Sequence, residues 1–376
     1  MRAMLLASAC ALAHFAVAMP TTAMAQDHQE PQTTAHEADE VTEVIVTATR
    51  REERLQDVPI SVTSLSQDDL NERGIVGYEG LAEATPGVVL NRPTANFNNF
   101  TARGIATNGY NANLQSPVAI YIDELPISAN GNSTILDPSL YDVERIEFLR
   151  GPQGTLFGSG SLAGALRILT HDPDPSGFDA SALVDFGLSD GGVLRQRYNG
   201  MVNIPLIDNE LALRIVGFVR NEDGWVDNIG TGVENSNRLV QYGGRAILQW
   251  EPTDRPTARR LFSHEISRPR DSALTNPALG EDIRLSDRPD LFQSEMNNLN
   301  ATFEYQFDGA RLTSSTTYGQ MDQLFYVDLA GTFGQTIAFA LDADGYDTNF
   351  VQETRIGSDA GGDWDLSAGA FYFRPR

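Results

Sequence analysis

The feature that most constrains this chain is the alternation of apolar and polar residues along its C-terminal half. The clearest case is 299–307, where Leu299, Ala301, Phe303, Tyr305 and Phe307 alternate with polar residues. A period of two places such side chains on opposite faces of a β-strand. Further strands are expected from Asp179 and near 195–204, 211–219, 238–250, 257–267, 311–326, 348–357 and 364–373. The C-terminal half is therefore predicted to be an antiparallel sheet of about nine strands, counted on this two-residue period.

The segments between these strands alternate in length. Short turns are expected at Asp208, 252–256, 307–310 and 358–363, after a first hairpin at 189–192. Long polar loops are expected near 221–237, 268–295 and 327–347. Short turns at one side and long loops at the other are typical of a transmembrane β-barrel, whereas a soluble β-sandwich, the alternative, has no such bias.

Charge and composition exclude several classes of function. The chain has 51 acidic and 27 basic residues, a formal net charge of −24, and its basic residues are all arginine. Nucleic acid is not an expected partner, because phosphate binding needs a basic face. The absence of lysine from the sequence excludes a Walker phosphate loop, a Schiff base and a lysine general base.

The N-terminus has the pattern of an export signal. Residues 1–25 contain Arg2, an apolar stretch and a small-x-small cleavage site at Ala23–Ala25. Cys10 lies in this segment and is the only cysteine, so cleavage after Ala25 would leave no thiol or disulfide. Residues 26–40 are polar and acidic and predict a disordered arm. His28 and His36 in this arm do not have the spacing of a metal site.

Residues 57–175 mix helix and strand patterns, which predicts a small α+β domain. Strands are expected at 60–63, 118–122, 143–149 and 166–170. Ser66 is expected to cap a short helix that has acidic residues in its first turn.

Five motifs between residues 43 and 170 resemble those of TonB-dependent outer-membrane receptors, in the group of iron-complex receptors. They are Glu43–Arg50, Asp57–Val62, Arg103–Ile105, Tyr121–Ile127 and Asp142–Gly158, the last continuing through Gly164–Thr170. The resemblance covers the tether and the plug, and reaches the barrel only through its strand pattern. It implies a periplasmic tether over 26–56, a plug domain over 57–175 and the N-terminal part of a β-barrel over 179–376.

The resemblance also implies roles for individual residues. The TonB box, which would bind the energising protein TonB, is predicted at Glu43, Val44, Ile45, Val46, Thr47 and Ala48. In the family, plug arginines pair with barrel glutamates, so Arg103 and Arg150 are expected to form a plug latch with Glu353. The alternative is that each is a surface arginine on a plug loop.

Plug loops of the family face the external ligand. The predicted ligand contacts are therefore Asn96, Phe97, Asn98, Phe100, Asn108, Tyr110 and Asn111. The alternative is that Asn and Gly in these loops only form turns.

The expected function is energised uptake of a scarce extracellular solute across the bacterial outer membrane, after Sec-type export. A ferric siderophore is the leading ligand, and a carbohydrate or cobalamin is the alternative; a passive porin, an adhesin or a nonfunctional remnant are rivals from other classes. No enzyme activity and no cofactor are expected, because His171 and His264 are isolated and no nucleophile has a plausible base.

The number of strands is smaller than the family's barrels require. Plugged barrels have about 22 strands, so about nine predict an incomplete barrel, from a fragment, a frameshift or a truncated gene. An open sheet leaves backbone groups unsatisfied in lipid, and we expect this chain alone not to be transport-competent.

Overall fold

In the computed structural model, residues Glu43–Arg376 form one compact unit. The structure describes residues 44–51, 53–92, 94–106, 116–127, 136–158, 160–188, 193–329, 339–358 and 366–375. The predicted signal peptide, the polar arm with its two histidines, and Glu43 lie outside these residues. Within them, no helix has both the length and the apolar character needed to cross a membrane.

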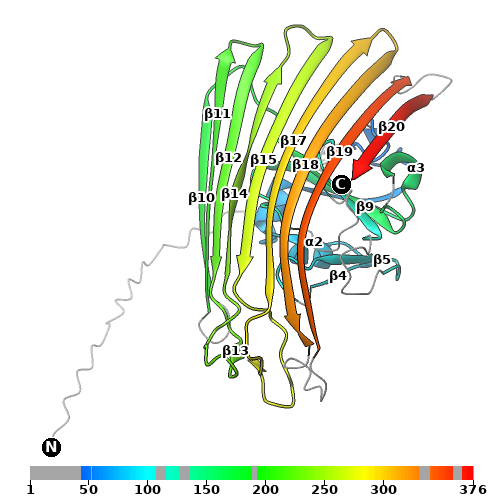
Figure 1. Ribbon diagram of the computed structural model, residues 1–376. Coiled ribbons are helices and arrows are strands. Elements are labelled where there is room, and N and C mark those ends of the chain that lie inside the picture. Colours follow the sequence, from blue (N-terminus) through cyan, green and yellow to red (C-terminus); the bar gives the residue numbers. More distant parts are fainter. Residues whose placement is uncertain are drawn as a thin grey trace, which may run out of the picture. The chain divides into compact units, whose positions relative to one another are not determined.

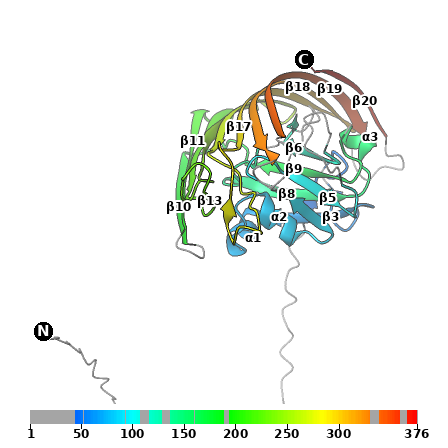
Figure 2. The ribbon, with the colours of Figure 1, turned by 60° about the horizontal axis from the view of Figure 1, so that its bottom comes forward.

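The C-terminal half is one antiparallel sheet of nine strands, as the alternation predicts. Its strands are β10 (Asp179–Leu188), β11 (Leu194–Ile207), β12 (Leu211–Glu222), β14 (Leu239–Trp250), β15 (Pro256–Pro269), β17 (Leu291–Phe307), β18 (Ala310–Asp328), β19 (Ala340–Ser358) and β20 (Ser367–Pro375). Each strand pairs with the next in this order. Among the described residues β10 and β20 are edge strands, so the sheet curves but does not close (Figures 1 and 2).

The two faces of this sheet differ as the two-residue period requires. On β17, Leu299 is 51% exposed, whereas Asn300 is 2% exposed and faces the concave side. The strand register aligns Leu299 with Phe262 on one neighbour and with Tyr318 on the other, and both of these are exposed. The convex face therefore carries apolar rows, and the concave face is mostly polar.

Connections of two lengths separate the strands. Short turns follow β11, β14, β17 and β19, while longer loops follow β12, β15 and β18. The last of these loops, 329–339, is shorter than predicted because β18 and β19 each extend to 19 residues. Two loops are joined by a parallel pair of short strands, β13 (Asp227–Asn228) and β16 (Ile283–Arg284).

A smaller α+β domain lies against the concave face of the sheet (Figures 1 and 2). We call it the inner domain, residues 53–170. Its elements are β3 (Ser61–Ser66), α1 (Gln67–Glu72), α2 (Tyr78–Ala84), β4 (Val88–Asn91), β5 (Asn99–Ala102), β6 (Val118–Ile122), β7 (Leu125–Pro126), β8 (Val143–Arg150), α3 (Gly154–Phe157) and β9 (Gly164–Thr170). The main sheet has the order β3-β8-β9-β6-β7.

Alternation along β8 separates the two cores of the inner domain. Phe148 packs with Tyr78 of α2 and Phe100 of β5 on one face, whereas Leu149 packs on the opposite face. The predicted N-cap of α1 is confirmed, because Ser66 and Asp69 form a reciprocal capping box.

The N-terminal strand covers the Leu149 face. It consists of β1 (Ile45–Val46), which pairs antiparallel with β2 (Glu53–Arg54). Val46 and Ala48 are fully buried in the core that contains Leu149 and Phe157. Val46 and Ala48 of the predicted TonB box therefore pack against the inner domain in this conformation, whereas Val44 and Ile45 are exposed.

Candidate functional site

The N-terminal strand is held by a buried ion pair of the inner domain. Glu147 of β8 and Arg167 of β9 lie opposite each other in the register, and their side chains are 0% and 3% exposed. The Thr47 backbone N–H donates to Glu147 Oε1 at 2.8 Å, and an Arg167 NH group donates to the Thr47 carbonyl at 2.6 Å. Thr47, which directly follows β1, thus forms hydrogen bonds with both members of a buried pair.

Arg50 fixes the other end of the same segment. Its guanidinium lies 2.9 Å from Glu124 Oε2 and donates through Nε to the Leu156 carbonyl at 3.2 Å. It also lies over the rings of Tyr121 and Phe157, at 4.7 and 4.3 Å from their centroids. Arg50 is therefore bound by a carboxylate, a carbonyl and two aromatic faces.

Glu124 connects this segment to the nine-stranded sheet. Arg355 of β19 binds it bidentately, at 2.8 and 3.0 Å. Burial alone would raise the pKa of Glu124, but Arg50 and Arg355 outweigh burial and lower that pKa to about 2. The N-terminal segment, the inner domain and the sheet thus meet at one ionised carboxylate.

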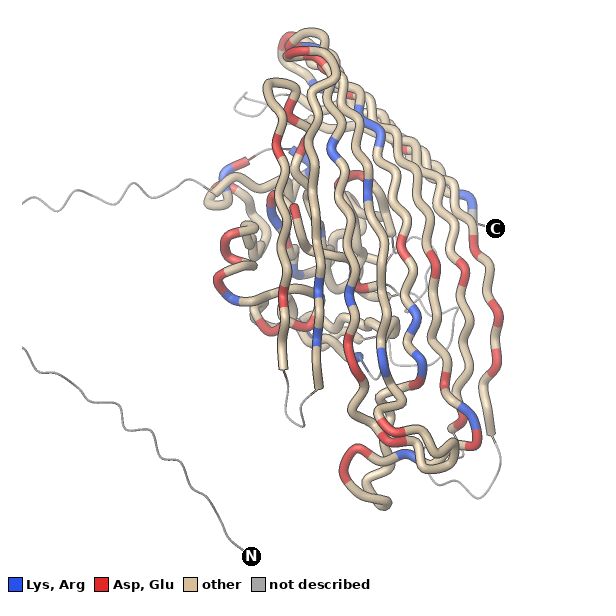
Figure 3. Tube along the Cα trace, turned by 90° about the vertical axis from the view of Figure 1, so that its left-hand side faces the viewer, with Lys and Arg blue, Asp and Glu red and all other residues tan. Residues whose placement is uncertain are grey.

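Three more carboxylates of the inner domain bind arginines of the sheet. Asp123 pairs with Arg259 at 2.9 Å, Asp142 pairs with Arg214 through two hydrogen bonds, and Asp137 lies 3.4 Å from Arg220. The tube in Figure 3 shows acidic and basic residues interspersed along the inner domain and the strands. Inner-domain carboxylates and sheet arginines therefore fasten the two parts together.

This arrangement corrects the predicted latch. Glu353 binds Arg355, at 3.2 Å, and lies 4.0 Å from Arg50. Arg150 donates to the Pro86 carbonyl at 3.1 Å, and Arg103 is exposed beside Gly151. Within the described ranges, neither arginine forms an ion pair with Glu353.

The physical reason lies in strand alternation. Side chains two positions apart on a strand lie on the same face, so Arg150 of β8 lies on the face of Ile146 and Phe148. This is the face opposite Glu147. The direction of the ion pairs also differs from the prediction. The latch was expected to join inner-domain arginines to a sheet glutamate, whereas in the structure inner-domain carboxylates bind sheet arginines.

The predicted ligand contacts in 96–100 are buried. Asn96, Phe97, Asn98 and Phe100 are between 0 and 4% exposed. Asn96 donates to the Phe292 carbonyl of β17 at 2.6 Å, and Phe97 packs against Phe292 and Val327. Asn96 and Phe97 thus attach the inner domain to the sheet, and Phe100 lies in the core of the inner domain. In this conformation none of the four side chains is open to a solute. Asn108, Tyr110 and Asn111 lie outside the described residues.

Sequence reasoning missed the residues that make the N-terminal attachment. Glu124 lies inside the quoted motif Tyr121–Ile127, and Arg355 lies two positions after Glu353. The signal that could have indicated Glu124 is its place just after the predicted buried strand 118–122, where a carboxylate needs a positively charged partner.

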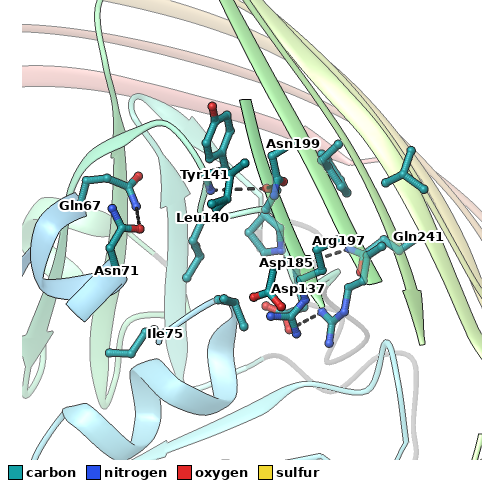
Figure 4. A pocket seen from close by; sticks show the side chains of 17 residues that line it. Gln67, Asn71, Ile75, Asp137, Leu140, Tyr141, Asp185, Arg197, Asn199 and Gln241 are labelled. Atoms are coloured by element: carbon teal, nitrogen blue, oxygen red, sulfur yellow. Dashed lines mark hydrogen bonds and ion pairs between the residues drawn. The ribbon is translucent and has the colours of Figure 1, made fainter. Parts of the chain in front are cut away.

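A pocket also lies between the inner domain and the first strands of the sheet. Figure 4 shows Gln67, Asn71 and Leu140 on one side of it. Asp185, Arg197 and Asn199 line it from β10 and β11. In the part of the chain that the structure describes, no group of three or more His, Cys, Asp or Glu residues is placed to hold a metal ion.

Comparison with known proteins identifies the inner domain. A family model described as TonB-dependent Receptor Plug Domain matches residues 54–165. The pesticin receptor of Yersinia pestis is 28% identical over 279 residues, covering 72% of this chain and 38% of that protein. The vitamin B12 transporter of Vibrio vulnificus is 23% identical over 339 residues, covering 85% and 49%.

A solved structure shows the same fold. The ferric yersiniabactin uptake receptor from Yersinia pestis superposes with a TM-score of 0.66 at 21% identity, covering 84% of this chain and 48% of that one. The chain thus spans about half, or less, of the length of the proteins that it matches.

Proposed function

We propose that this chain is part of a TonB-dependent receptor, and that the whole receptor imports a scarce extracellular solute with energy from TonB. The observation that carries the proposal is the docked N-terminal strand. It is bound to a buried ion pair and to Glu124, and Glu124 is in turn bound to the sheet. A pull on a segment attached in this way can be transmitted to both the inner domain and the nine-stranded sheet.

The surface of the strand supports TonB as the partner. Val44 and Ile45 are 45% and 39% exposed, and among the described residues β1 pairs with β2 alone. An unpaired strand edge can accept another protein's strand through backbone hydrogen bonds. We therefore propose that residues 43–48 bind TonB by strand addition.

A ferric siderophore is the proposed solute. The relatives with this fold include a ferric yersiniabactin uptake receptor and a ferripyoverdine receptor. Cobalamin is the second candidate, because the vitamin B12 transporter matches 85% of this chain. Competition between a ferric siderophore and cyanocobalamin for the same receptor separates the two.

The proposed location is the bacterial outer membrane, reached through the export signal at 1–25. The aligned exposed side chains Phe262, Leu299, Tyr318 and Phe350 form an apolar row on the convex face. Such a face suits lipid, and the polar concave face suits the lumen of a barrel.

The test is deletion of residues 44–48 from the whole receptor. Solute binding to the cells should remain, and uptake should fall to the level seen when a protonophore removes the energy source. Uptake that survives both the deletion and the protonophore would indicate a passive porin and would overturn the proposal.

A further inference from the structure

One carboxyl group of the sheet is buried beneath the inner domain without a cationic partner. Glu265 of β15 is 6% exposed and lies on the concave face. The described residues supply it with one hydrogen bond, from Gln241 Nε2 to Oε1 at 2.6 Å, and with no ion pair. The four carboxylates that fasten the inner domain to the sheet each bind an arginine, so Glu265 differs from all of them.

The neighbours of Glu265 in the sheet carry no charge. The strand register places it between Gly243 of β14 and Met296 of β17. A Cβ on Gly243 would lie 2.3 Å from the His264 carbonyl oxygen, so only glycine fits at that position. The Met296 side chain is 6% exposed and has no hydrogen-bond donor. Neither adjacent strand therefore places a donor or a positive charge directly opposite this carboxyl.

The inner domain covers the same carboxyl with apolar side chains. Glu265 lines a small cavity of about 40 Å³ between the sheet and the inner domain, which contributes Ile122, Pro138 and Ile168 to its lining. A cavity of this size can hold a water molecule but not the hydration shell of a carboxylate. Burial in such surroundings disfavours the ionised form of a carboxyl group.

Two titratable groups of the inner domain face this site. Gln241 also donates to the Asp137 carbonyl at 2.7 Å, and Asp137 and Gln241 are both labelled in Figure 4. The Asp137 carboxylate disfavours a second negative charge on Glu265. Tyr78 is fully buried and carries no charge at neutral pH. The inner domain therefore adds no positive charge that would stabilise an ionised Glu265.

The arginines that face the site from the sheet are bound to other carboxylates. Arg220 of β12 lies 2.8 Å from Glu222 and 3.4 Å from Asp137. Arg245 of β14 lies 3.5 Å from the Asp142 carboxylate and donates to the Asp142 carbonyl at 2.6 Å. Both guanidinium groups thus have carboxylate partners other than Glu265.

We propose that Glu265 is a proton-binding site, which holds its proton while the inner domain covers it and gives the proton to water when the inner domain moves away. Gln241 donates to Oε1, which leaves Oε2 to carry the proton towards the cavity. When the inner domain leaves, the O–H bond breaks, the proton passes to the entering water and the carboxylate becomes hydrated. The proposal concerns the contact between the inner domain and the sheet, and does not depend on the solute or on TonB.

The proposal implies a pH dependence with a definite sign. The covered state binds one proton more than the uncovered state over the range in which Glu265 is protonated only when covered. Attachment of the inner domain should therefore be strongest at low pH within this range and weaken as the pH rises through it.

The first test is infrared spectroscopy of the whole receptor in detergent at about pH 7. The C=O band of protonated carboxyl groups should be larger in wild type than in Glu265→Gln, by the contribution of one group. Glu295→Gln is the matched control, because Glu295 lies on the neighbouring strand β17 and on the opposite, convex face. It should keep the wild-type band. A band of equal size in wild type and Glu265→Gln overturns the proposal.

A second variant tests the cause of the protonation. Met296→Arg keeps Glu265 and places a cation directly opposite it in the register, which should favour the ionised carboxylate. The folded variant should lose the same part of the infrared band that Glu265→Gln loses. A band that stays as large as in wild type would show that a missing counter-charge is not what keeps the proton on Glu265.

The third measurement follows the attachment itself. The urea concentration that makes the inner domain accessible to a brief pulse of protease is compared among wild type, Glu265→Gln and Glu295→Gln at the same pH, from about pH 6 to about pH 9. Relative to Glu265→Gln, the wild-type ratio of detached to attached inner domain should rise with pH, by up to roughly tenfold per pH unit. Glu295→Gln should follow wild type. The same pH dependence in wild type and Glu265→Gln would contradict coupling between this proton and the attachment.

Discussion

Glu124 lies beside three arginines from different parts of the chain. It binds Arg50 of the N-terminal segment and Arg355 of β19, and Arg167 lies 3.8 Å away. Hydrogen bonds between ionised groups are roughly twice as strong as neutral ones, so a carboxylate shared by several arginines is tightly bound.

Replacing this carboxylate should loosen the N-terminal segment. Glu124→Gln keeps the shape of the side chain but removes the shared counter-charge of Arg50 and Arg355, which then have only Glu353, at 4.0 and 3.2 Å; the cost is about 3 kcal/mol. We expect faster proteolysis and faster hydrogen exchange in 44–51. Glu144→Gln is the control, since Glu144 is 51% exposed. Equal protection of 44–51 in both variants would contradict the role of Glu124.

The same carboxylate sets a pH dependence. The pKa of Glu124 is lowered from 4.5 to about 2 in the folded chain, so its contribution is complete above pH 4.5 and disappears as the pH falls towards 2. Protection of 44–51 should therefore be constant from neutral pH down to about 5 and decrease below it. In Glu124→Gln the part of this decrease that Glu124 causes should be absent. If protection of 44–51 depends on pH in the same way in wild type and in Glu124→Gln, Glu124 is not the group responsible.

At the scale of elements, the sequence predicted those features that depend on neighbouring residues in the chain. The two-residue alternation predicted the nine strands of the sheet, and Ser66 predicted the start of α1, because both depend on neighbouring residues. Contacts between distant residues left no such pattern. Glu124 and Arg355 are 231 positions apart, and the sequence does not show which arginine a given carboxylate meets.

The N-terminal segment shows the same limit. The resemblance predicted that residues 43–48 bind TonB, but it did not show that in this conformation β1 pairs with β2 and Thr47 is bound by Glu147 and Arg167. Asn96 and Phe97 were expected to meet a solute because plug loops of the family that the chain resembles face the external ligand, but tertiary packing buries them here.

A change of backbone in this strand should release it. Thr47→Pro removes the N–H that donates to the buried Glu147, so the carboxylate keeps its contact with Arg145 but loses one hydrogen bond to a charged group, at a cost of about 1.5–3 kcal/mol. Thr47→Ala keeps that N–H and should dock more tightly than the proline variant. The comparison is made by hydrogen exchange of residues 45–50; faster exchange in the alanine variant than in the proline variant would refute the account.

At the scale of the molecule, the inner domain lies between two places with different proposed tasks. The long loops after β12 and β15 lie at one end of the sheet, whereas Arg355 lies near the short turn after β19 at the other. The four carboxylate–arginine attachments hold the inner domain to the sheet between these ends. Solute capture and energy input are thus proposed to act on opposite sides of one fastened domain.

The most direct test measures solute binding and energised uptake in the same cells for Thr47→Ala and Thr47→Pro in the whole receptor. Thr47→Ala keeps the backbone N–H that donates to Glu147, so it should bind solute and retain most of its energised uptake. Thr47→Pro should bind solute normally, and its energised uptake should stay impaired even at saturation, because the energy-coupling segment is displaced. If Thr47→Pro weakens binding as much as uptake, or takes up solute as well as Thr47→Ala does, the account is wrong.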